Sequence, residues 1–149
     1  MGILKLAGLV GVSVLLGAAT AAADKTCYGV AKMQYINKGG YTVSDFYVMY
    51  KDENGDKQEG YRHRSDLTVG ETVLIDLTLI SGPPSVGDEV WGKLAIEGGD
   101  RNGCRKDGTK FYYDKSGGTI SYKSGGTTLN NNRCKLNRRP DDKKIIDCP

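Results

Sequence analysis

The feature that most constrains this chain is its set of four cysteines, Cys27, Cys104, Cys134 and Cys148. They lack the closely spaced pairs that are typical of a zinc site. All four follow an N-terminal stretch with the features of an export signal. An even number of cysteines in that setting favours two disulfides.

Four cysteines allow three connectivities, and we favour Cys27–Cys148 together with Cys104–Cys134. The first bridge would tie the two ends of the domain together. In the loop-entropy model it would contribute roughly 4–5 kcal/mol, and the second bridge roughly 3–4 kcal/mol.

Residues 1–23 are predicted to be a signal peptide. Lys5 supplies the positive charge, Leu6 to Leu16 the apolar region and Ala21-Ala22-Ala23 the small-residue cleavage site. Glycines interrupt the apolar region, which is shorter than the roughly 20 residues that a spanning helix needs. We therefore expect a secreted protein, extracellular or (in a bacterium) periplasmic, with residues 24–149 as a single domain.

The net charge of the mature chain does not indicate a ligand class. Removing Lys5 leaves 20 basic and 18 acidic side chains, a net charge of +2. This balance argues neither for nor against nucleic acid, which we do not expect as a partner.

Short alternating segments separated by glycine-rich turns predict an all-β chain. Seven or eight such strands favour a two-sheet antiparallel β-sandwich over a barrel. The expected strands cover residues 27–36, 41–51, 57–64, 73–79, 89–97, 110–114, 119–123 and 143–147.

Three details of these strands can be checked. Asn54-Gly55 is expected to form a type I′ hairpin turn, and the polar segment 57–64 an edge strand. Alternate residues are expected to face the core, namely Val73, Ile75, Leu77 and Leu79 in one strand and Val90, Leu94 and Ile96 in another.

Catalysis has little support in the sequence, and we expect no enzyme and no cofactor. The single histidine, His63, lies in a polar strand without a nucleophile motif nearby. Asp52, Asn54 and Asp56 have the wrong spacing for an EF-hand, and a hairpin turn explains them more simply.

Aromatic and basic residues are the remaining candidates for recognition. Tyr112 and Tyr113 are adjacent, so one should face outward, and Tyr122 follows on the next strand. Exposed rings suit sugar stacking or a lipid interface, although cross-strand packing would also explain them. Basic residues gather between Arg101 and Lys115 and again in the tail after Asn132, as a solvated face or as a surface for an anionic partner.

Two stretches resemble one known family. Residues 37–50, NKGGYTVSDFYVMY, look like the strand that opens the C-terminal β-sandwich of the cholesterol-dependent (thiol-activated) cytolysins. Gly126-Thr127-Thr128-Leu129 is similar to a G-T-T-L segment near the end of that domain, and Leu67-Thr68-Val69-Gly70 lies where the next strand pair would be.

The resemblance implies a stand-alone membrane-recognition sandwich. In that family a Thr-Leu pair at the tip recognises cholesterol, and it corresponds here to Thr128-Leu129. The loop after Glu97 and the loop that carries Leu129 would share one tip near Cys104 and Cys134, which agrees with the favoured disulfides.

The chain departs from the family where the tryptophan-rich tip loop should fall. Residues 98–108 contain no aromatic side chain, and the upstream domains that form the pore are missing. Burying Leu129 in lipid would contribute roughly 1.5–3 kcal/mol, too little for stable attachment by itself. Charged recognition at the tip is therefore favoured over sterol insertion, and the candidate ligand-binding residues are Thr128, Leu129, Arg101, Arg105, Lys106 and Arg133.

The leading hypothesis is a secreted, non-catalytic recognition protein that binds a membrane-surface component (lipid, sterol or glycan) through loops at one tip. The alternative is a secreted effector or inhibitor that acts by protein–protein interaction, using a sheet face or the edge strand 57–64.

Overall fold

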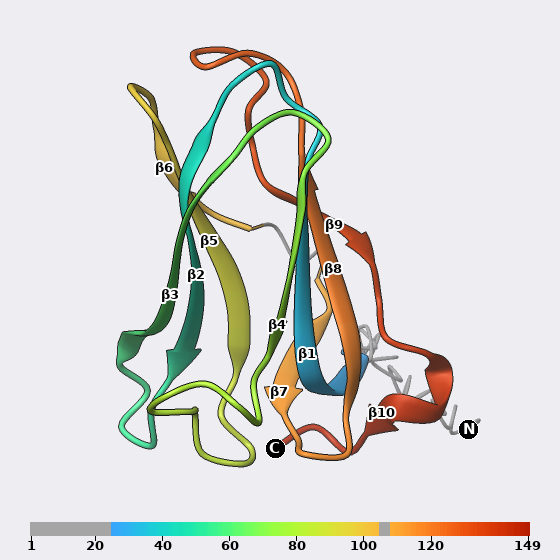
Figure 1. The fold of residues 1–149 in the computed structure, drawn as a ribbon. Helices are drawn as coiled ribbons and strands as arrows, with labels where there is room; N and C mark the ends of the chain where they lie inside the picture. The colour runs from blue at the N-terminus through green and yellow to red at the C-terminus, as the bar shows by residue number, and fades with distance from the viewer. Residues whose placement is uncertain (1–24, 105–107) are drawn as a thin grey trace, which may run out of the picture.

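The structure is a computed structural model that describes residues 25–104 and 108–149 (Figure 1). Within these residues ten strands and one 3-10 turn form two facing sheets. The elements are β1 (Cys27–Asn37), β2 (Val43–Lys51), β3 (Lys57–Leu67), β4 (Thr72–Asp76), β5 (Val90–Ile96), β6 (Arg101–Gly103), β7 (Lys110–Tyr113), β8 (Gly118–Ser124), β9 (Lys135–Arg138), η1 (Asp142–Lys144) and β10 (Ile145–Ile146).

The predicted two-sheet, all-β class with two disulfides is confirmed. Four strands pair in the order β3-β2-β5-β6, and the other six are organised around β1. The lower half of β1 pairs with β7 and β10, and its upper half pairs with β4 and β8. The pairings of β1 with β7 and β8 are parallel, whereas the other pairings are antiparallel. The expected edge strand is confirmed too, since β3 ends the four-stranded sheet.

A bulge in β1 allows both halves of this long strand to face the core. Tyr28 and Val30 point inward in the lower half, and Met33 and Tyr35 point inward in the upper half. The inward positions change from even to odd because the pairing register shifts between Val30 and Lys32. One extra residue in a strand has this effect, because side chains alternate with a period of two.

The core fills the space between the sheets. The rings of Tyr35 and Phe46 stack across it, with centroids 4.8 Å apart. Val90, Leu94 and Ile96 are buried as predicted. The other large, fully buried side chains between the sheets include Tyr122, Phe111, Leu77 and Ile120.

Both favoured disulfides are present. Cys27–Cys148 joins β1 to the end of the chain, and Cys104–Cys134 links the segment after β6 to the segment before β9. The second bridge therefore connects the two sheets. The bridge was expected at the tip, and this expectation needs correction. The amide of Cys104 donates to the carbonyl oxygen of Gly92, so the bridge lies beside the middle of β5 and not at the end of the sandwich.

Two local predictions were wrong. The strand expected over 73–79 ends at Asp76, so Leu77 is still buried but Leu79 is 82% exposed. The turn at Asn54-Gly55 is not type I′, because Gly55 has a positive φ and Asn54 does not. The Gly55 amide instead donates to the Asp52 carbonyl, as in a turn followed by a left-handed glycine.

The number of strands was also underestimated. The very short β6 and β9 carry no alternating apolar pattern, and the strand expected over 143–147 consists of η1 followed by the two residues of β10. The predicted signal peptide, residues 1–23, lies outside the described residues. In the described part of the chain, no helix has the length and apolar character needed to cross a membrane.

A buried amide holds two loops together at the upper end of the sandwich. Asn37 is fully buried, and its Nδ2 donates to the carbonyl oxygens of Tyr41 at 2.7 Å and Leu67 at 2.9 Å. Its Oδ1 accepts from the amide of Gly39 at 2.9 Å. The β1–β2 and β3–β4 connections therefore share one anchor.

We expect Asn37→Ala to lower the unfolding free energy by about 2–4 kcal/mol, because it leaves two buried carbonyls and one amide without their partner. Chemical denaturation would measure the loss. Asn54→Ala, at an exposed turn position, should change stability by less than about 0.5 kcal/mol. Equal effects of the two substitutions would contradict the anchoring role of Asn37.

Candidate functional site

Four loops meet at the upper pole of the sandwich, and we call them together the tip (Figure 1). They are residues 38–42, 68–71, 97–100 and 125–132. The backbone amide of Gly70 donates to the carbonyl oxygen of Asn37, and that of Gly40 donates to the carbonyl oxygen of Gly126. The Asn132 side chain lies 3.5 Å from Asp100 Oδ2. The loop after Glu97 and the loop that carries Leu129 therefore share one tip, as predicted.

Leu129 lies at the apex of a four-residue turn. Thr127 and Asn130 exchange backbone hydrogen bonds, which leaves Leu129 75% exposed. Gly126 has a φ of 75°, and a side chain there would collide with the Asn130 carbonyl, so glycine is required. Val69, in the β3–β4 loop at the same pole, is 64% exposed.

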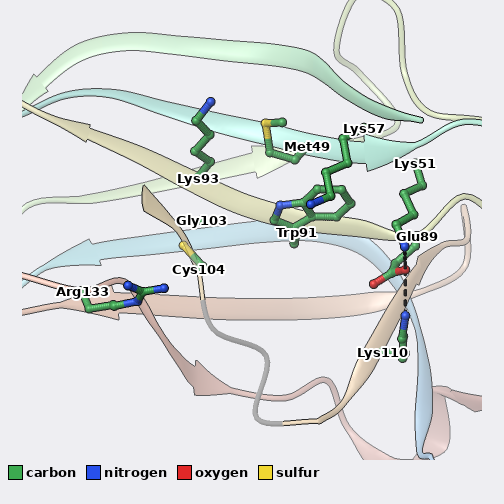
Figure 2. A pocket seen from close by; sticks show the side chains of 10 residues that line it. All are labelled: Met49, Lys51, Lys57, Glu89, Trp91, Lys93, Gly103, Cys104, Lys110 and Arg133. Carbon is green, nitrogen blue, oxygen red and sulfur yellow. Dashed lines mark hydrogen bonds and ion pairs between the residues drawn. The ribbon is translucent and has the colours of Figure 1, made fainter. Parts of the chain in front are cut away.

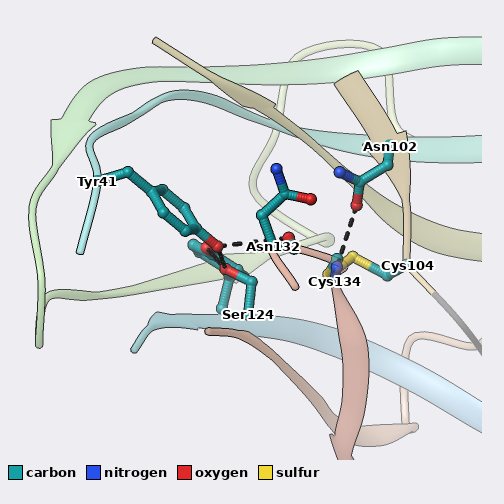
Figure 3. Close-up of a disulfide and its surroundings, with 7 residues drawn as sticks. Tyr41, Asn102, Cys104, Ser124, Asn132 and Cys134 are labelled. Atoms are coloured by element: carbon teal, nitrogen blue, oxygen red, sulfur yellow. Dashed lines mark hydrogen bonds between the residues drawn. A yellow bond between two sulfur atoms is a disulfide. The ribbon is translucent and has the colours of Figure 1, made fainter. Parts of the chain in front are cut away.

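A buried hydroxyl cluster supports this turn from below (Figure 3). The Tyr41 hydroxyl donates to Ser124 Oγ at 2.6 Å and lies 3.0 Å from the carbonyl oxygen of Gly125. Tyr35 shares a hydrogen bond with the same Ser124 hydroxyl, and burial raises the pKa of Tyr35 well above its ordinary value. The start of the Leu129 loop is thus fixed to the core.

A pocket of about 310 Å³ lies just below the turn, and we call it the tip pocket. Four cationic side chains line it, and no carboxylate does: Lys38, Lys123, Arg133 and Lys135. Lys123 and Lys135 are directly opposed in the β8–β9 register. Like charges in such a pair destabilise a sheet, so the arrangement favours an anion between them.

The structure separates the six predicted ligand-binding residues. Leu129 is at the apex of the tip, and Thr128 is half-buried, with its carbonyl accepting from Asn132 Nδ2 at 2.7 Å. Arg133 is exposed and lines the tip pocket. Arg101 lies over the outer face of the four-stranded sheet instead, and Arg105 and Lys106 are outside the described residues.

That outer face carries a second apolar cluster. Tyr47, Met49, Trp91 and Ala95 are each at most 8% exposed, although they point away from the core. Neighbouring strands align them, since Met49 pairs with Trp91 in the register. Long basic side chains cover the cluster and keep it from water.

Three cations surround the Tyr47 ring. Arg62, Lys93 and Arg101 have their charged groups 5.5, 5.4 and 5.3 Å from the ring centroid. Arg101 also donates a hydrogen bond to the Tyr47 hydroxyl. Arg62 in turn forms two hydrogen bonds to Asp45, at 2.6 and 2.9 Å, which hold the pKa of that carboxyl below its ordinary value.

A larger hollow opens beside this cluster, and we call it the basic groove (Figure 2). It has a volume of about 630 Å³. Trp91, Met49, Gly103 and Cys104 form part of its lining. Its charged side chains are Lys51, Lys57, Lys93, Lys110, Arg133 and Glu89.

Glu89 links the two sides of the basic groove. Its Oε2 lies 3.4 Å from Lys51 Nζ, on the four-stranded sheet, and 2.9 Å from Lys110 Nζ, on β7. The carboxylate is 7% exposed, and its proximity raises the pKa of Lys110. Farther along the groove, Lys93 pairs with Glu59 at 2.5 Å and lowers the pKa of that carboxyl.

The tyrosines proposed for stacking are mostly buried. Tyr112 is half-buried and Tyr113 is 2% exposed, so one of the pair does face outward as predicted. Tyr122 is fully buried and has no face to offer a ligand. Tyr113 and Tyr122 both belong to the core between the sheets.

Sequence reasoning missed the lysines of the basic groove. A signal was present in β2, which has apolar residues on both faces: Phe46 and Val48 inward, Tyr47 and Met49 outward. A strand that is apolar on both sides predicts a covered outer face. His63 lies on β3, at the open edge between the sheets, and the described residues contain no cluster of three or more potential metal ligands.

No protein-family model and no curated protein matches the chain. Among solved structures, it is similar to pneumolysin, a cholesterol-dependent cytolysin, with 13% sequence identity and a TM-score of 0.41. The match covers 76% of this chain and 24% of pneumolysin, so this chain spans about a quarter of that protein's length. The likeness to pneumolysin is a distant one.

The Asp45–Arg62 pair gives a prediction with a defined pH dependence. We expect Asp45→Asn to lower the unfolding free energy by about 1–2 kcal/mol at neutral pH, a modest value because the Arg62 side chain is 42% exposed. Since the pKa of Asp45 is depressed, the contribution is complete above about pH 4 and is lost as the pH falls through that pKa.

Chemical denaturation of the wild type and of Asp45→Asn, repeated from about pH 7 to about pH 2, would measure this. The unfolding free energies of the two proteins should converge in acid. Asp66→Asn, at an exposed position of the neighbouring strand β3, should have little effect at neutral pH. A loss at Asp45 that persists in acid would mean that its charge is not the cause.

Proposed function

We propose that this chain is a secreted, non-catalytic recognition protein whose tip attaches to an anionic membrane surface, with lipid head groups as its ligand. The observation that carries the proposal is the position of Leu129, an exposed apolar apex directly above a pocket with four cations and no carboxylate. On such a surface the apolar side chain can enter the acyl region of a membrane while the cations contact the charged head groups.

Magnitudes support a two-part attachment. Inserting Leu129 contributes roughly 1.5–3 kcal/mol. Each cation near an anionic membrane contributes about 1 kcal/mol, so the four residues of the tip pocket contribute about as much again or more. Stable membrane attachment generally needs two such signals, and here the turn supplies one and the pocket below it supplies the other.

Sterol insertion has less support. The described part of the loop that would carry tryptophans is occupied by β6 and Cys104. An inserted tryptophan, burying about 150–250 Å², would add several kcal/mol that this tip lacks. The proposal therefore gives the head group, and not the sterol, the main role.

Three observations support the rest of the proposal. The carboxylates of Asp45 and Glu89 are engaged in ion pairs, which favours structural over acid–base roles. Two disulfides suit an extracellular or periplasmic location. The tip exposes aliphatic side chains rather than aromatic rings on which bases could stack, so nucleic acid is not proposed as a partner.

Flotation with vesicles tests the tip. We expect binding to phosphatidylcholine vesicles that contain phosphatidylserine and much weaker binding to phosphatidylcholine alone. Leu129→Ala should lower the partition coefficient about tenfold. Lys123→Ala/Lys135→Ala should lower it by about ten- to thirtyfold, on the anionic vesicles only.

Matched controls lie away from the tip. Leu79→Ala removes an equally exposed leucine at the opposite pole, and Lys115→Ala/Lys143→Ala removes two exposed lysines. These variants should bind like the wild type. Equal losses of vesicle binding in the tip and control variants would refute the proposal. Strong binding to uncharged vesicles that contain cholesterol would instead give the sterol the main role.

A groove at the open edge of the sandwich supports a second candidate function, the binding of a partner protein. The groove, of about 460 Å³, lies between β3 and β4 and is lined in part by the exposed Leu74 and Leu79. One side of β3 has no strand beside it in the described structure, so an extended partner segment could pair there.

Capture of such a partner from extracellular fluid should be abolished by Leu79→Asp and should resist competition by lipid. Leu129→Asp is the matched control. Capture that depends on Leu129 and not on Leu79 would exclude this edge.

A further inference from the structure

We infer that the basic groove is a second binding site, distinct from the tip, and that it takes an acidic polysaccharide bearing sulfate or carboxylate groups. It lies on the side of the sandwich where β5 faces β7, whereas the proposed membrane contact lies at the tip. The inference therefore does not depend on the proposed function.

Unbalanced charge is the first argument. Five cations and one carboxylate line the groove. Glu89 is shared between Lys51 and Lys110, and Lys93 has Glu59. In the described structure no ion pair engages Lys57 or Arg133, so the groove keeps a net positive charge that an anion can neutralise.

The second argument is the cost that this arrangement imposes on the fold. Lys51 and Lys57 are directly opposed across the β2–β3 hairpin. Like charges at such positions are destabilising. Together with Lys110, which reaches the groove from the other sheet, they form a cationic group that exceeds the charge of Glu89.

Three of the five cations are also held in position. Glu89 fixes Lys51 and Lys110 from opposite sides, and the Tyr47 ring and Glu59 hold Lys93. Arg133 directly precedes a disulfide-bonded cysteine. Side chains that are already ordered lose less entropy when a ligand binds, and the apolar cluster beneath them strengthens their field.

The burial of the groove's aromatic and apolar side chains favours one class of anionic ligand over the others. Trp91 is 8% exposed and Tyr47 1%, so no ring face is open for a nucleic-acid base to stack on. The apolar side chains of the lining are buried and leave no pocket for the anchor residues of an acidic peptide. A polysaccharide needs neither, because its regularly repeated charges can meet successive lysines along an open groove.

Titration with a short heparin fragment, in solution and without lipid, tests the inference. We expect saturable binding that weakens with salt. Lys57→Ala/Lys93→Ala should lower the affinity about tenfold, whereas Lys115→Ala/Lys143→Ala removes the same charge elsewhere and should change it by less than about twofold. Lys57→Arg should retain binding, because it keeps the charge.

Two further measurements separate this site from the tip and from unspecific attraction. Lys57→Ala/Lys93→Ala should bind anionic vesicles like the wild type, and Leu129→Ala should bind heparin like the wild type. Equal losses of heparin affinity in the groove and control variants would overturn the inference. So would equal competition by polyglutamate or single-stranded DNA, which would reduce the groove to a general anion surface.

Discussion

The Cys104–Cys134 bridge links the two sheets covalently, and the two candidate surfaces are arranged around it. Cys104 directly follows the short strand β6, and Cys134 directly precedes β9. Asn102 Oδ1 accepts the amide of Cys134 at 3.0 Å, so a hydrogen bond reinforces the same junction (Figure 3). Neither β6 nor β9 has an apolar pattern that would dock it alone. The bridge fixes both strands and thereby shapes the walls of the tip pocket and the basic groove.

Charge is used differently on the two surfaces. On the outer face of the four-stranded sheet, the cations lie over an apolar cluster and are partly balanced by Asp45, Glu59 and Glu89. Their stems shield apolar side chains, and their charged groups remain in water. At the tip, no carboxylate lines the pocket, and the neighbouring apolar residue is exposed rather than covered. The first arrangement therefore keeps apolar side chains from water as well as attracting anions, whereas the second leaves its apolar residue exposed.

Sequence patterns predicted the class of fold because alternation and glycine-rich turns are local signals. They also indicated both disulfides, the edge strand β3 and the inward residues of β5. They did not show the bulge in β1 or its parallel neighbours, because these features depend on partners distant in the sequence. The strand expected to continue to Leu79 ended early for a related reason. Asp76 accepts hydrogen bonds from the backbone amide and hydroxyl of Thr78, and this local turn ends the ladder.

The positions of the candidate residues were predicted in part. The loop pattern and the family resemblance brought Leu129 and Arg133 to one end of the molecule, where the structure also has them. Arg101 was misplaced because its position on β6 directs its side chain toward Tyr47, and β6 was not foreseen. The lysines of the basic groove come from β2, β3, β5 and β7, so no single segment of the sequence shows them as a group.

Arg133 lines both the tip pocket and the basic groove. Its guanidinium can pair closely with an anion in only one of the two hollows at a time, so an anion that recruits it to one withdraws it from the other. By thermodynamic linkage, each ligand must then weaken the other by the same factor. A single side chain between the two sheets would thus make occupancy of the two surfaces antagonistic, without any rearrangement of the backbone.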